Sequence, residues 1–238
     1  MKLEYSSHVK MLRYIARTAK NMFGVFPRKC NLCGFSGSFH AFGTPPRFDA
    51  KCPHCGSLER HRLFGLWLEQ NTSLIAGRQL LHFAPEGILT QILKPLAAHY
   101  QTADLNPESA DIVLNIEHID LPDNSIDAIL CSHVLEHVNY RQALSELRRV
   151  LRPNGDLLLL FPIVEGWDDT YSNDTITTPK DRELHFGQCD HSQLFGRHIR
   201  QDIRMAGFTV DEFTATEPDV STYGLIRGEK LFIAHRQS

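Results

Sequence analysis

Two consecutive runs decide the fold: LPDNSIDAILCSHVLEHV at residues 121–138 and ALSELRRVLRPNGDLLLLFP at residues 143–162. After a turn-forming Pro-Asp-Asn, the pattern predicts a buried strand at Ser125–Cys131, and Asp156–Pro162 is the most apolar strand expected in the chain. Between them, Tyr140–Leu151 has helical periodicity and is closed by Arg-Pro-Asn-Gly. A strand, a helix and a strand in this order predict a parallel sheet covered by helices.

The same alternation extends toward the N-terminus as far as Gly77. We expect strands at Gln79–Ala84, Tyr100–Leu105 and Asp111–Ile116, and a helix at Ile88–Ala98. Ligands of such sheets bind beyond the carboxyl ends of the strands, so the residues that follow each strand are the candidates for function.

Toward the C-terminus, residues 163–190 are polar and irregular. We expect a helix at His191–Gly207 and a closing antiparallel pair of strands at Phe208–Ala215 and Lys230–His235. The predicted fold class is therefore α/β, with a Rossmann-like, doubly wound and mostly parallel seven-stranded sheet.

Four of the six cysteines form two C-x2-C pairs, at Cys30, Cys33, Cys52 and Cys55. A glycine follows each second cysteine, so each pair is expected in a tight turn, and two such turns supply four thiolates to one Zn²⁺. Four sulfur ligands leave no position for an activated water. The spacing thus predicts a structural zinc ribbon.

Composition limits the class of protein. The 238 residues are 42% hydrophobic, enough for one full-sized domain and a small one. No apolar run is long enough for a transmembrane segment, and the N-terminus lacks a secretory signal, which predicts a soluble cytoplasmic protein.

Charge is unevenly distributed along the chain. Residues 1–62 hold eleven Lys and Arg against three acidic residues, which leaves 14 basic and 25 acidic side chains for the rest. Within this basic front end, residues 8–23 have the periodicity of an amphipathic helix. Its partner is either an anionic surface, namely RNA or a peripheral membrane contact, or the protein itself.

The two runs quoted above resemble the middle of the class I methyltransferases that use S-adenosylmethionine (SAM), of the methyltransferase type 11 kind. The resemblance covers residues 79–162, and more weakly the tail HSQLFGRHIRQDIRMAGFTV. Bacterial members that carry a cysteine ribbon are also similar through CPHCGSLERHRL, HFAPE and FGQCDH. The resemblance implies a chain built from a basic amphipathic helix (1–26), a zinc ribbon (27–57), a linking helix (58–77) and a methyltransferase domain (78–238).

The resemblance also implies cofactor-binding positions. Asp104 matches the acidic residue that binds both ribose hydroxyls of SAM, although an aspartate that only caps the following turn would look the same in sequence. The remaining matches are a segment that frames the adenine and two residues that border the methyl group: Asn115, Ile116 and Glu117 for the former, Ser132 and His133 for the latter.

The turn after the first strand departs from the family pattern. It reads HFAPEG at residues 82–87, so only Ala84 and Gly87 are small where the family has several glycines. Glu86 has two interpretations: it pairs with the ammonium group of SAM, or it is an ordinary acidic residue in the first turn of a helix.

Methyl transfer needs the reacting atoms in line and, for a hydroxyl acceptor, a base. The candidate catalytic residues are His133, His185 and His191, with His137 as a further candidate base. An aromatic segment within 163–190 has the composition of a lid.

Three functions remain open on the sequence. The first is O- or N-methylation of a small molecule or glycan. The second is an RNA methyltransferase that holds RNA through its basic front end. The third is a non-catalytic binding module that has lost the SAM site. The oligomeric state is left open.

Overall fold

The computed structural model describes residues 9, 11–16, 18–19, 24, 26–43 and 45–237. The chain divides into two compact units. One comprises residues 1–66 with 215–228, and the other residues 67–214 with 229–238. The sequence did not predict that residues 215–228, which lie between the last two strands of the larger unit, would belong to the N-terminal unit.

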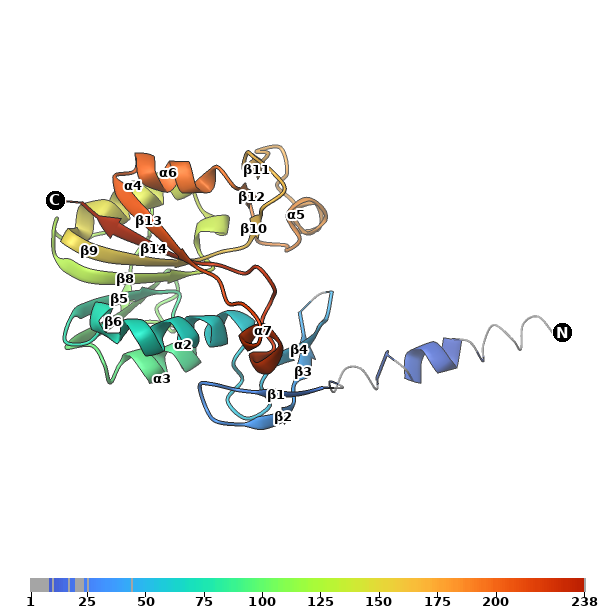
Figure 1. The fold of residues 1–238 in the computed structure, drawn as a ribbon. Helices are drawn as coiled ribbons and strands as arrows, with labels where there is room; N and C mark the ends of the chain where they lie inside the picture. Colours follow the sequence, from blue (N-terminus) through green and yellow to red (C-terminus); the bar gives the residue numbers. More distant parts are fainter. Residues whose placement is uncertain are drawn as a thin grey trace. The chain divides into compact units, whose positions relative to one another are not determined.

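A seven-stranded sheet is the centre of the larger unit (Figure 1). Its strands are β5 (Gln79–Phe83), β6 (His99–Asp104), β7 (Ile112–Val113), β8 (Ile126–Ser132), β9 (Leu151–Leu160), β13 (Phe208–Phe213) and β14 (Leu231–Arg236). Their spatial order is β13-β14-β9-β8-β5-β6-β7, and β14 runs antiparallel to both of its neighbours while the other pairs are parallel. The predicted fold class is confirmed.

The order of the strands reverses at the first of them. The chain passes from β5 to β6 and β7 on one side, and then returns to place β8 and β9 on the other side. Two neighbouring strands whose connections leave in opposite directions open a crevice at their carboxyl ends. In this sheet the switch point lies between β5 and β8, and the term crevice refers here to the carboxyl ends of these two strands.

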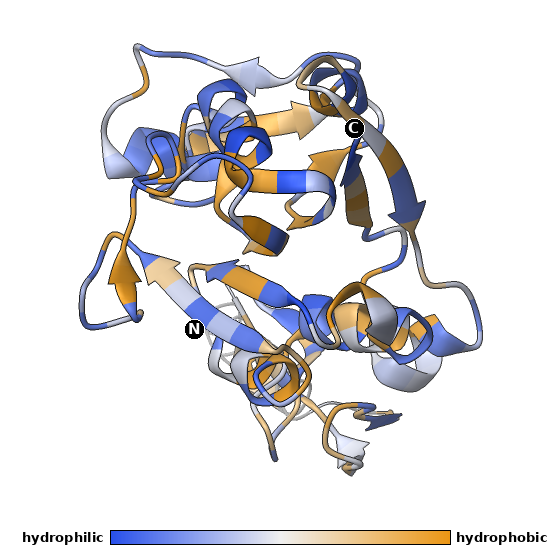
Figure 2. Ribbon diagram, turned by 90° about the vertical axis from the view of Figure 1, so that its left-hand side faces the viewer, coloured by the Kyte–Doolittle hydropathy of each residue, from blue (hydrophilic) through white to orange (hydrophobic). Residues whose placement is uncertain are grey.

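Alternating side chains of the strands pack on helices on both faces of the sheet. Leu81 and Phe83 of β5 join one large core cluster with buried residues of α4 (Tyr140–Val150) and α6 (Ile199–Met205), while α3 (Gly87–Leu93) lies on the other face (Figure 1). Figure 2 shows hydrophobic residues along the strands of the sheet. Because successive side chains of β5 point to opposite faces, apolar residues of this strand are buried on both faces of the sheet.

The prediction of one helix over His191–Gly207 is wrong. Residues Gln193–Gly196 form strand β12, and the helix begins only at Ile199. β12 pairs with two short strands of the segment predicted as irregular, β10 (Ile163–Val164) and β11 (Tyr171–Ser172). This pairing requires a glycine at position 196, because a Cβ there would lie 2.3 Å from the carbonyl oxygen of Asp169. The strand needs this close backbone approach.

Other element boundaries differ by smaller amounts. The expected strand at Asp111–Ile116 is reduced to β7, and β9 begins at Leu151, five residues earlier than expected. Residues 163–190 also contain helix α5 (Pro179–Phe186), which Thr178 caps by accepting a hydrogen bond from the backbone N–H of Asp181.

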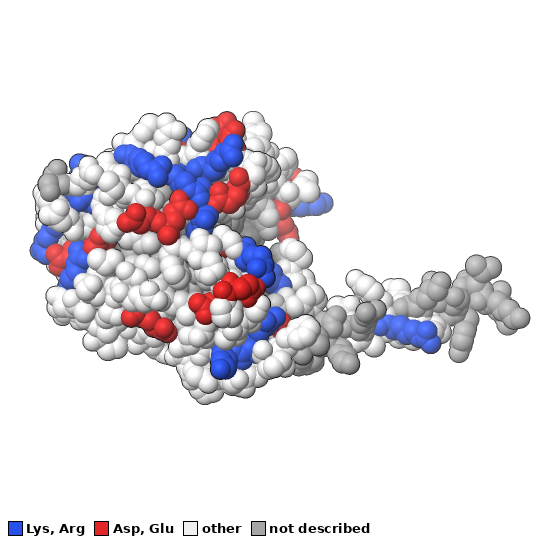
Figure 3. Space-filling model, viewed as in Figure 1, with Lys and Arg blue, Asp and Glu red and all other residues white. Residues whose placement is uncertain are grey.

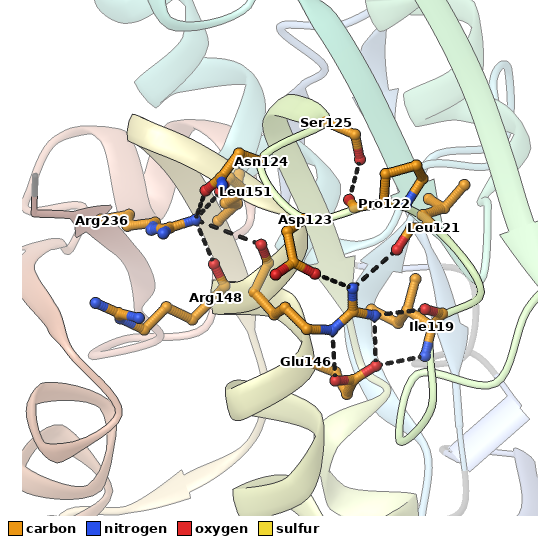
Figure 4. A network of polar contacts seen from close by, with 11 residues as sticks. Ile119, Leu121, Pro122, Asp123, Asn124, Ser125, Glu146, Arg148, Leu151 and Arg236 are labelled. Atoms are coloured by element: carbon orange, nitrogen blue, oxygen red, sulfur yellow. Dashed lines mark hydrogen bonds and ion pairs between the residues drawn. The ribbon is translucent and has the colours of Figure 1, made fainter.

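Arg149 locks the end of α4 to the turn before β8 (Figure 4). Its guanidinium donates to both carboxylate oxygens of Glu146 at 2.8 Å, to Asp123 at 2.7 Å, and to the carbonyl oxygens of Ile119 and Leu121. The Glu146 carboxylate also accepts the backbone N–H of Ile119 at 2.8 Å. This network holds the start of β8 in register at the amino end of the sheet, away from the crevice.

The smaller unit is built from two antiparallel ribbons and helices. β1 (Pro27–Lys29) pairs with β2 (Ser36–Ser38), and β3 (His40–Phe42) pairs with β4 (Arg47–Lys51). The predicted linking helix corresponds to α2 (Glu59–Asn71), which begins in the smaller unit and ends in the larger one, where the 3-10 turn η1 (Thr72–Leu74) follows. Residues 215–228 contribute α7 (Asp219–Tyr223).

The amphipathic helix predicted over residues 8–23 lies partly outside the described residues. Residues 1–7 and 25 of the predicted N-terminal segment 1–26 also lie outside them. Residues 9, 11–16 and 18–19 are helical, and Leu12 and Ile15 of the expected apolar stripe are exposed. Among the helices that the structure describes, none combines the length and the hydropathy that crossing a membrane requires.

Candidate functional site

The crevice between β5 and β8 is flanked by two residues in an unusual backbone conformation. Ala84 follows β5 with φ of 49°, and His133 follows β8 with φ of 54°. Residues other than glycine rarely adopt this left-handed region, and functional sites are where such strain collects. Ala84 thus forms a sharp turn directly after β5.

Glu86 and Ser132 connect the two sides of the crevice. The Ser132 hydroxyl donates a 3.0 Å hydrogen bond to Oε2 of Glu86, and Ser132 is buried. A Cβ on the neighbouring Gly87 would meet no atom within 4 Å, so the space above this turn is open. The glycine-poor turn therefore keeps room for a ligand.

Asp104 ends β6, the strand next to β5. Its Oδ1 accepts the backbone N–H of Asn106 at 2.8 Å, which is the capping role that the sequence left open. A carboxylate has two oxygens, so Oδ2 still has acceptor capacity.

The segment predicted to frame the adenine is largely engaged within the protein. Asn115 accepts the backbone N–H of Glu117, and Glu117 accepts the backbone N–H of Asn139 at 2.7 Å. Ile116 is 4% exposed and belongs to the core cluster. The backbone and exposed edge of Asn115 are the parts of this segment that a ligand can reach.

The structure brings together three of the four candidate histidines. Nδ1 of His133 lies 3.0 Å from the buried carboxylate of Glu136, and the rings of His137 and His191 meet edge to face with centroids 4.8 Å apart. Burial lowers the pKa of His191, which favours its neutral form at neutral pH. Glu136 was not predicted, although the H-x-x-E-H spacing at 133–137 is a signal that could have found it.

His185 lies in a separate aromatic cluster. Its Nδ1 is 2.8 Å from the Tyr171 hydroxyl, and the Tyr171 ring contacts both Trp167 and Phe186. These residues come from β11, α5 and the loop before them. The aromatic side chains that the sequence grouped as a lid therefore do pack on one another.

The four predicted metal ligands converge in the smaller unit. Their sulfur atoms all lie within 4.8 Å of one another, with Cys30 to Cys55 at 3.6 Å and Cys33 to Cys52 at 3.8 Å. Sulfurs placed tetrahedrally on one Zn²⁺ at about 2.3 Å are about 3.8 Å apart. The distances between the four sulfur atoms thus fit one tetrahedrally coordinated ion.

Both cysteine turns have the same backbone geometry. The N–H of Gly34 donates to the carbonyl of Cys30 at 2.9 Å, and that of Gly56 to the carbonyl of Cys52 at 3.0 Å. The two glycines have φ of 76° and 75°. This left-handed position explains why glycine follows each pair.

The thiols differ in how readily they ionise. Burial raises the pKa of Cys33 to about 12. Burial acts in the same direction on Cys55, but hydrogen bonds with Ser57 outweigh it and lower the pKa of Cys55 to about 7. Of these two thiols, Cys55 therefore ionises more readily near neutral pH.

Arg62 joins residues 215–228 to the cysteine turns. Its fully buried guanidinium donates to the carbonyl oxygens of Ser57 and Ala50, and to those of Tyr223 and Gly224 near the end of α7. Burial lowers the pKa of Arg62. This bridge is the physical reason why the returning segment belongs to the smaller unit.

Part of the positive charge of the front end is neutralised locally. Arg28 pairs with Asp49 and Arg47 with Glu59, each at 2.8 Å. In the larger unit, Arg200 bridges two glutamates. On the face shown in Figure 3, Lys and Arg side chains lie beside Asp and Glu.

A cavity of about 740 Å³ is remote from the crevice. It lies between α4 and α6 and is lined by Arg148, Arg236 and Asn124, near the amino end of β8. None of the predicted site residues lines it.

Comparison with known proteins finds a matching family model, one relative and several solved structures of similar fold. Residues 82–159 match a protein family described as "Methyltransferase domain". An uncharacterized protein of Methanocaldococcus jannaschii is 49% identical over 49 residues, which is 21% of this chain. The matched stretch spans 22% of that relative's own length.

Several solved structures share the fold. One is a chain from a complex of the Haloferax volcanii Trm112 methyltransferase activator with a proposed methyltransferase, with a TM-score of 0.56, 14% identity, and coverage of 75% of this chain and 91% of that one. Another is a SAM-dependent methyltransferase from Mesorhizobium loti, with a TM-score of 0.52, 15% identity, and coverage of 73% and 100%. Residues 82–159 thus match the methyltransferase-domain family, on a sheet with the fold of SAM-dependent methyltransferases.

Proposed function

We propose that this protein is a SAM-dependent methyltransferase that modifies a hydroxyl or amine of a small molecule or glycan. The observation that carries the proposal is the hydrogen bond between Glu86 and Ser132 across the crevice at the switch point, with Asp104 at the end of the adjacent strand. These groups stand where a doubly wound sheet binds its ligand.

Each of these residues has a distinct role in holding SAM. The free oxygen of Asp104 accepts from the ribose, and the Glu86 carboxylate pairs with the ammonium of the methionine part. Ala84 and Gly87 provide the close backbone approach. Bound SAM supplies an electrophilic methyl group on its sulfonium, so the protein's main task is to align the acceptor with that methyl.

The base for a hydroxyl acceptor comes from the histidines after β8. His133 is directly after Ser132, and its imidazole is partly exposed. Its Nδ1 lies 3.0 Å from the carboxylate of Glu136, and this contact orients the ring. An amine acceptor that is already neutral does not need this step.

The cysteine cluster fits zinc in a structural role. Four thiolates fill a tetrahedral coordination sphere and leave no position for a substrate. The ion would hold together two turns that share a small core of Cys30, Phe39 and Cys52.

An RNA acceptor is less well supported. RNA binding needs unpaired cations that replace the counterions of phosphates. Arg28 and Arg47 are already paired with carboxylates, and the Arg62 guanidinium is buried against carbonyl oxygens.

The test is calorimetric titration of the zinc-loaded protein with S-adenosylhomocysteine, comparing wild type with Asp104→Ala. We expect the substitution to weaken binding at least tenfold, since hydrogen bonds to a charged group contribute about 1.5–3 kcal/mol. The matched control is Asp174→Ala, an exposed aspartate outside the crevice, which should bind as wild type does. Absence of binding by folded wild type would overturn the proposal in favour of a non-catalytic module.

A further inference from the structure

Glu136 is a buried carboxylate without hydrogen bonds to its oxygens. Glu136 is 1% exposed, and among the described residues no donor makes a hydrogen bond to its Oε1 or Oε2. Nδ1 of His133 lies 3.0 Å from Oε1. Since a buried charge without partners is costly, such a group in a native fold indicates an ion or a proton donor that completes it.

Two imidazole rings have a nitrogen atom near this carboxylate. His191 is 3% exposed and its Nδ1 has no hydrogen-bond partner among the described residues. Nδ1 of His137 lies 3.1 Å from the carbonyl oxygen of Asp190. One ligand atom from each of Glu136, His137 and His191 lies within 4.8 Å of the others.

The backbone holds these three side chains together across a long stretch of sequence. Glu136 and His137 lie in the 3-10 turn η2 (Leu135–His137) directly after β8, and His191 lies just before β12. The buried amide of Gln193 donates to the carbonyl oxygens of Leu135 and Val138, at 2.7 and 2.9 Å. These bonds fix the two segments before any ligand binds.

We propose that Glu136, His137 and His191 form a metal site separate from the cysteine cluster, which binds one divalent transition-metal ion through a carboxylate oxygen and two imidazole nitrogens. Two imidazoles and one carboxylate are a ligand set typical of Zn²⁺, Mn²⁺, Fe²⁺ or Co²⁺. Ligands on one ion at about 2.1 Å are about 3–4 Å apart, so binding draws the three atoms together by about 1 Å. His133 lies beside the carboxylate, with its Nδ1 3.0 Å from Oε1 of Glu136.

Three protein ligands leave coordination positions open. Because Ser132 and His133 connect this site to the methyl-transfer crevice, an open position can bind the oxygen of a hydroxyl acceptor and lower its pKa. This consequence rests on the proposed function. In the transfer, the hydroxyl gives its proton to a base, its oxygen bonds to the methyl carbon, and the carbon–sulfur bond breaks to leave S-adenosylhomocysteine.

The test is titration of the full-length, zinc-loaded protein with Mn²⁺, followed by the loss of the free-ion EPR signal. Mn²⁺ is suited to this test because thiolates prefer Zn²⁺, so it does not displace zinc from the cysteine cluster. We expect one Mn²⁺ per chain in wild type, with ¹⁴N couplings from imidazole in its pulsed EPR spectrum. We expect Glu136→Gln and His191→Ala to weaken binding more than tenfold while the zinc content is unchanged.

Matched controls separate this site from general surface binding and from unfolding. Glu108→Gln and His99→Ala replace exposed residues of the same types and should bind Mn²⁺ as wild type does. Glu136→Gln keeps the shape of the side chain, and circular dichroism verifies its fold. Wild type that binds no Mn²⁺, Co²⁺ or Zn²⁺ beyond the cysteine cluster overturns the proposal, as does binding that persists in both Glu136→Gln and His191→Ala.

Two further measurements distinguish this inference from the proposed function. Binding of S-adenosylhomocysteine to the same samples tests the function independently of the metal. Enhanced water-proton relaxation by the bound Mn²⁺ tests for an open position, and a closed coordination sphere would overturn the role in binding the acceptor.

Discussion

The hydroxyl of Ser132, at the end of β8, donates a 3.0 Å hydrogen bond to the carboxylate of Glu86, in the turn after β5. This bond orients a carboxylate over the switch point of the sheet, in a turn whose residues 82–87 include a single glycine. An acidic side chain held in this way is suited to pair with an ammonium group.

We predict that Glu86→Gln weakens S-adenosylhomocysteine binding by at least about tenfold, because the amide keeps an acceptor for Ser132 but loses the charge that pairs with the ammonium. Ser132→Ala should weaken it by only about fivefold, because it removes an orienting hydrogen bond. Calorimetry measures both, with Glu108→Gln as the control. Wild-type affinity in Glu86→Gln would show that this carboxylate serves the protein's structure alone.

We predict that Arg149→Met lowers the free energy of unfolding by about 3 kcal/mol, because it leaves the mostly buried Glu146 carboxylate without its partner. Arg141→Met, which breaks an exposed ion pair with Asp202, should cost less than about 1 kcal/mol. Urea unfolding followed by fluorescence measures the difference. Equal losses for the two variants would contradict a special role of the network in Figure 4.

The pH dependence of stability should carry a contribution from Glu146. Hydrogen bonds from Arg149 lower the pKa of Glu146 from its ordinary value of 4.5 to about 2. Because the folded-state pKa is the lower one, this stabilisation is complete above about pH 4.5 and is lost as the pH falls through about 2.

The measurement is the difference in unfolding free energy between wild type and Glu146→Gln from pH 6 down to about 2. We expect the difference to shrink across this window. In an Arg149→Met background the same comparison should give a flatter difference, since the partner that lowers the pKa is absent. A difference that is independent of pH in the wild-type background would contradict the prediction.

We predict that Cys33→Ser or Cys55→Ser removes bound zinc and unfolds the smaller unit, because four thiolates hold its two turns together. Cys189→Ser replaces an exposed cysteine outside the cluster and should retain zinc. Elemental analysis and the thiolate-to-metal charge-transfer band of the Co²⁺-substituted protein measure the effect. Zinc retained at full stoichiometry in both ligand variants would contradict it.

Much of the fold could be predicted because its signals are local. The apolar alternation around Ser125–Cys131 and Asp156–Pro162 depends only on which residues of each strand are buried. The prediction of a seven-stranded sheet, which the structure confirms, succeeded for this reason. The helix predicted at His191–Gly207 failed because strand pairing with β10 and β11 decides residues 193–196, and that pairing is not visible in the periodicity of the segment.

The sequence by itself determined the strands of the seven-stranded sheet and the two cysteine turns, since both follow from spacings of a few residues. Only the tertiary structure brought Glu86 to Ser132, 46 residues away, and Arg62 to Tyr223, 161 residues away. It likewise placed His191 beside Glu136 and His137. The physical reason is that local periodicity states which face of an element is buried, whereas contacts between distant residues depend on the order in which the strands assemble.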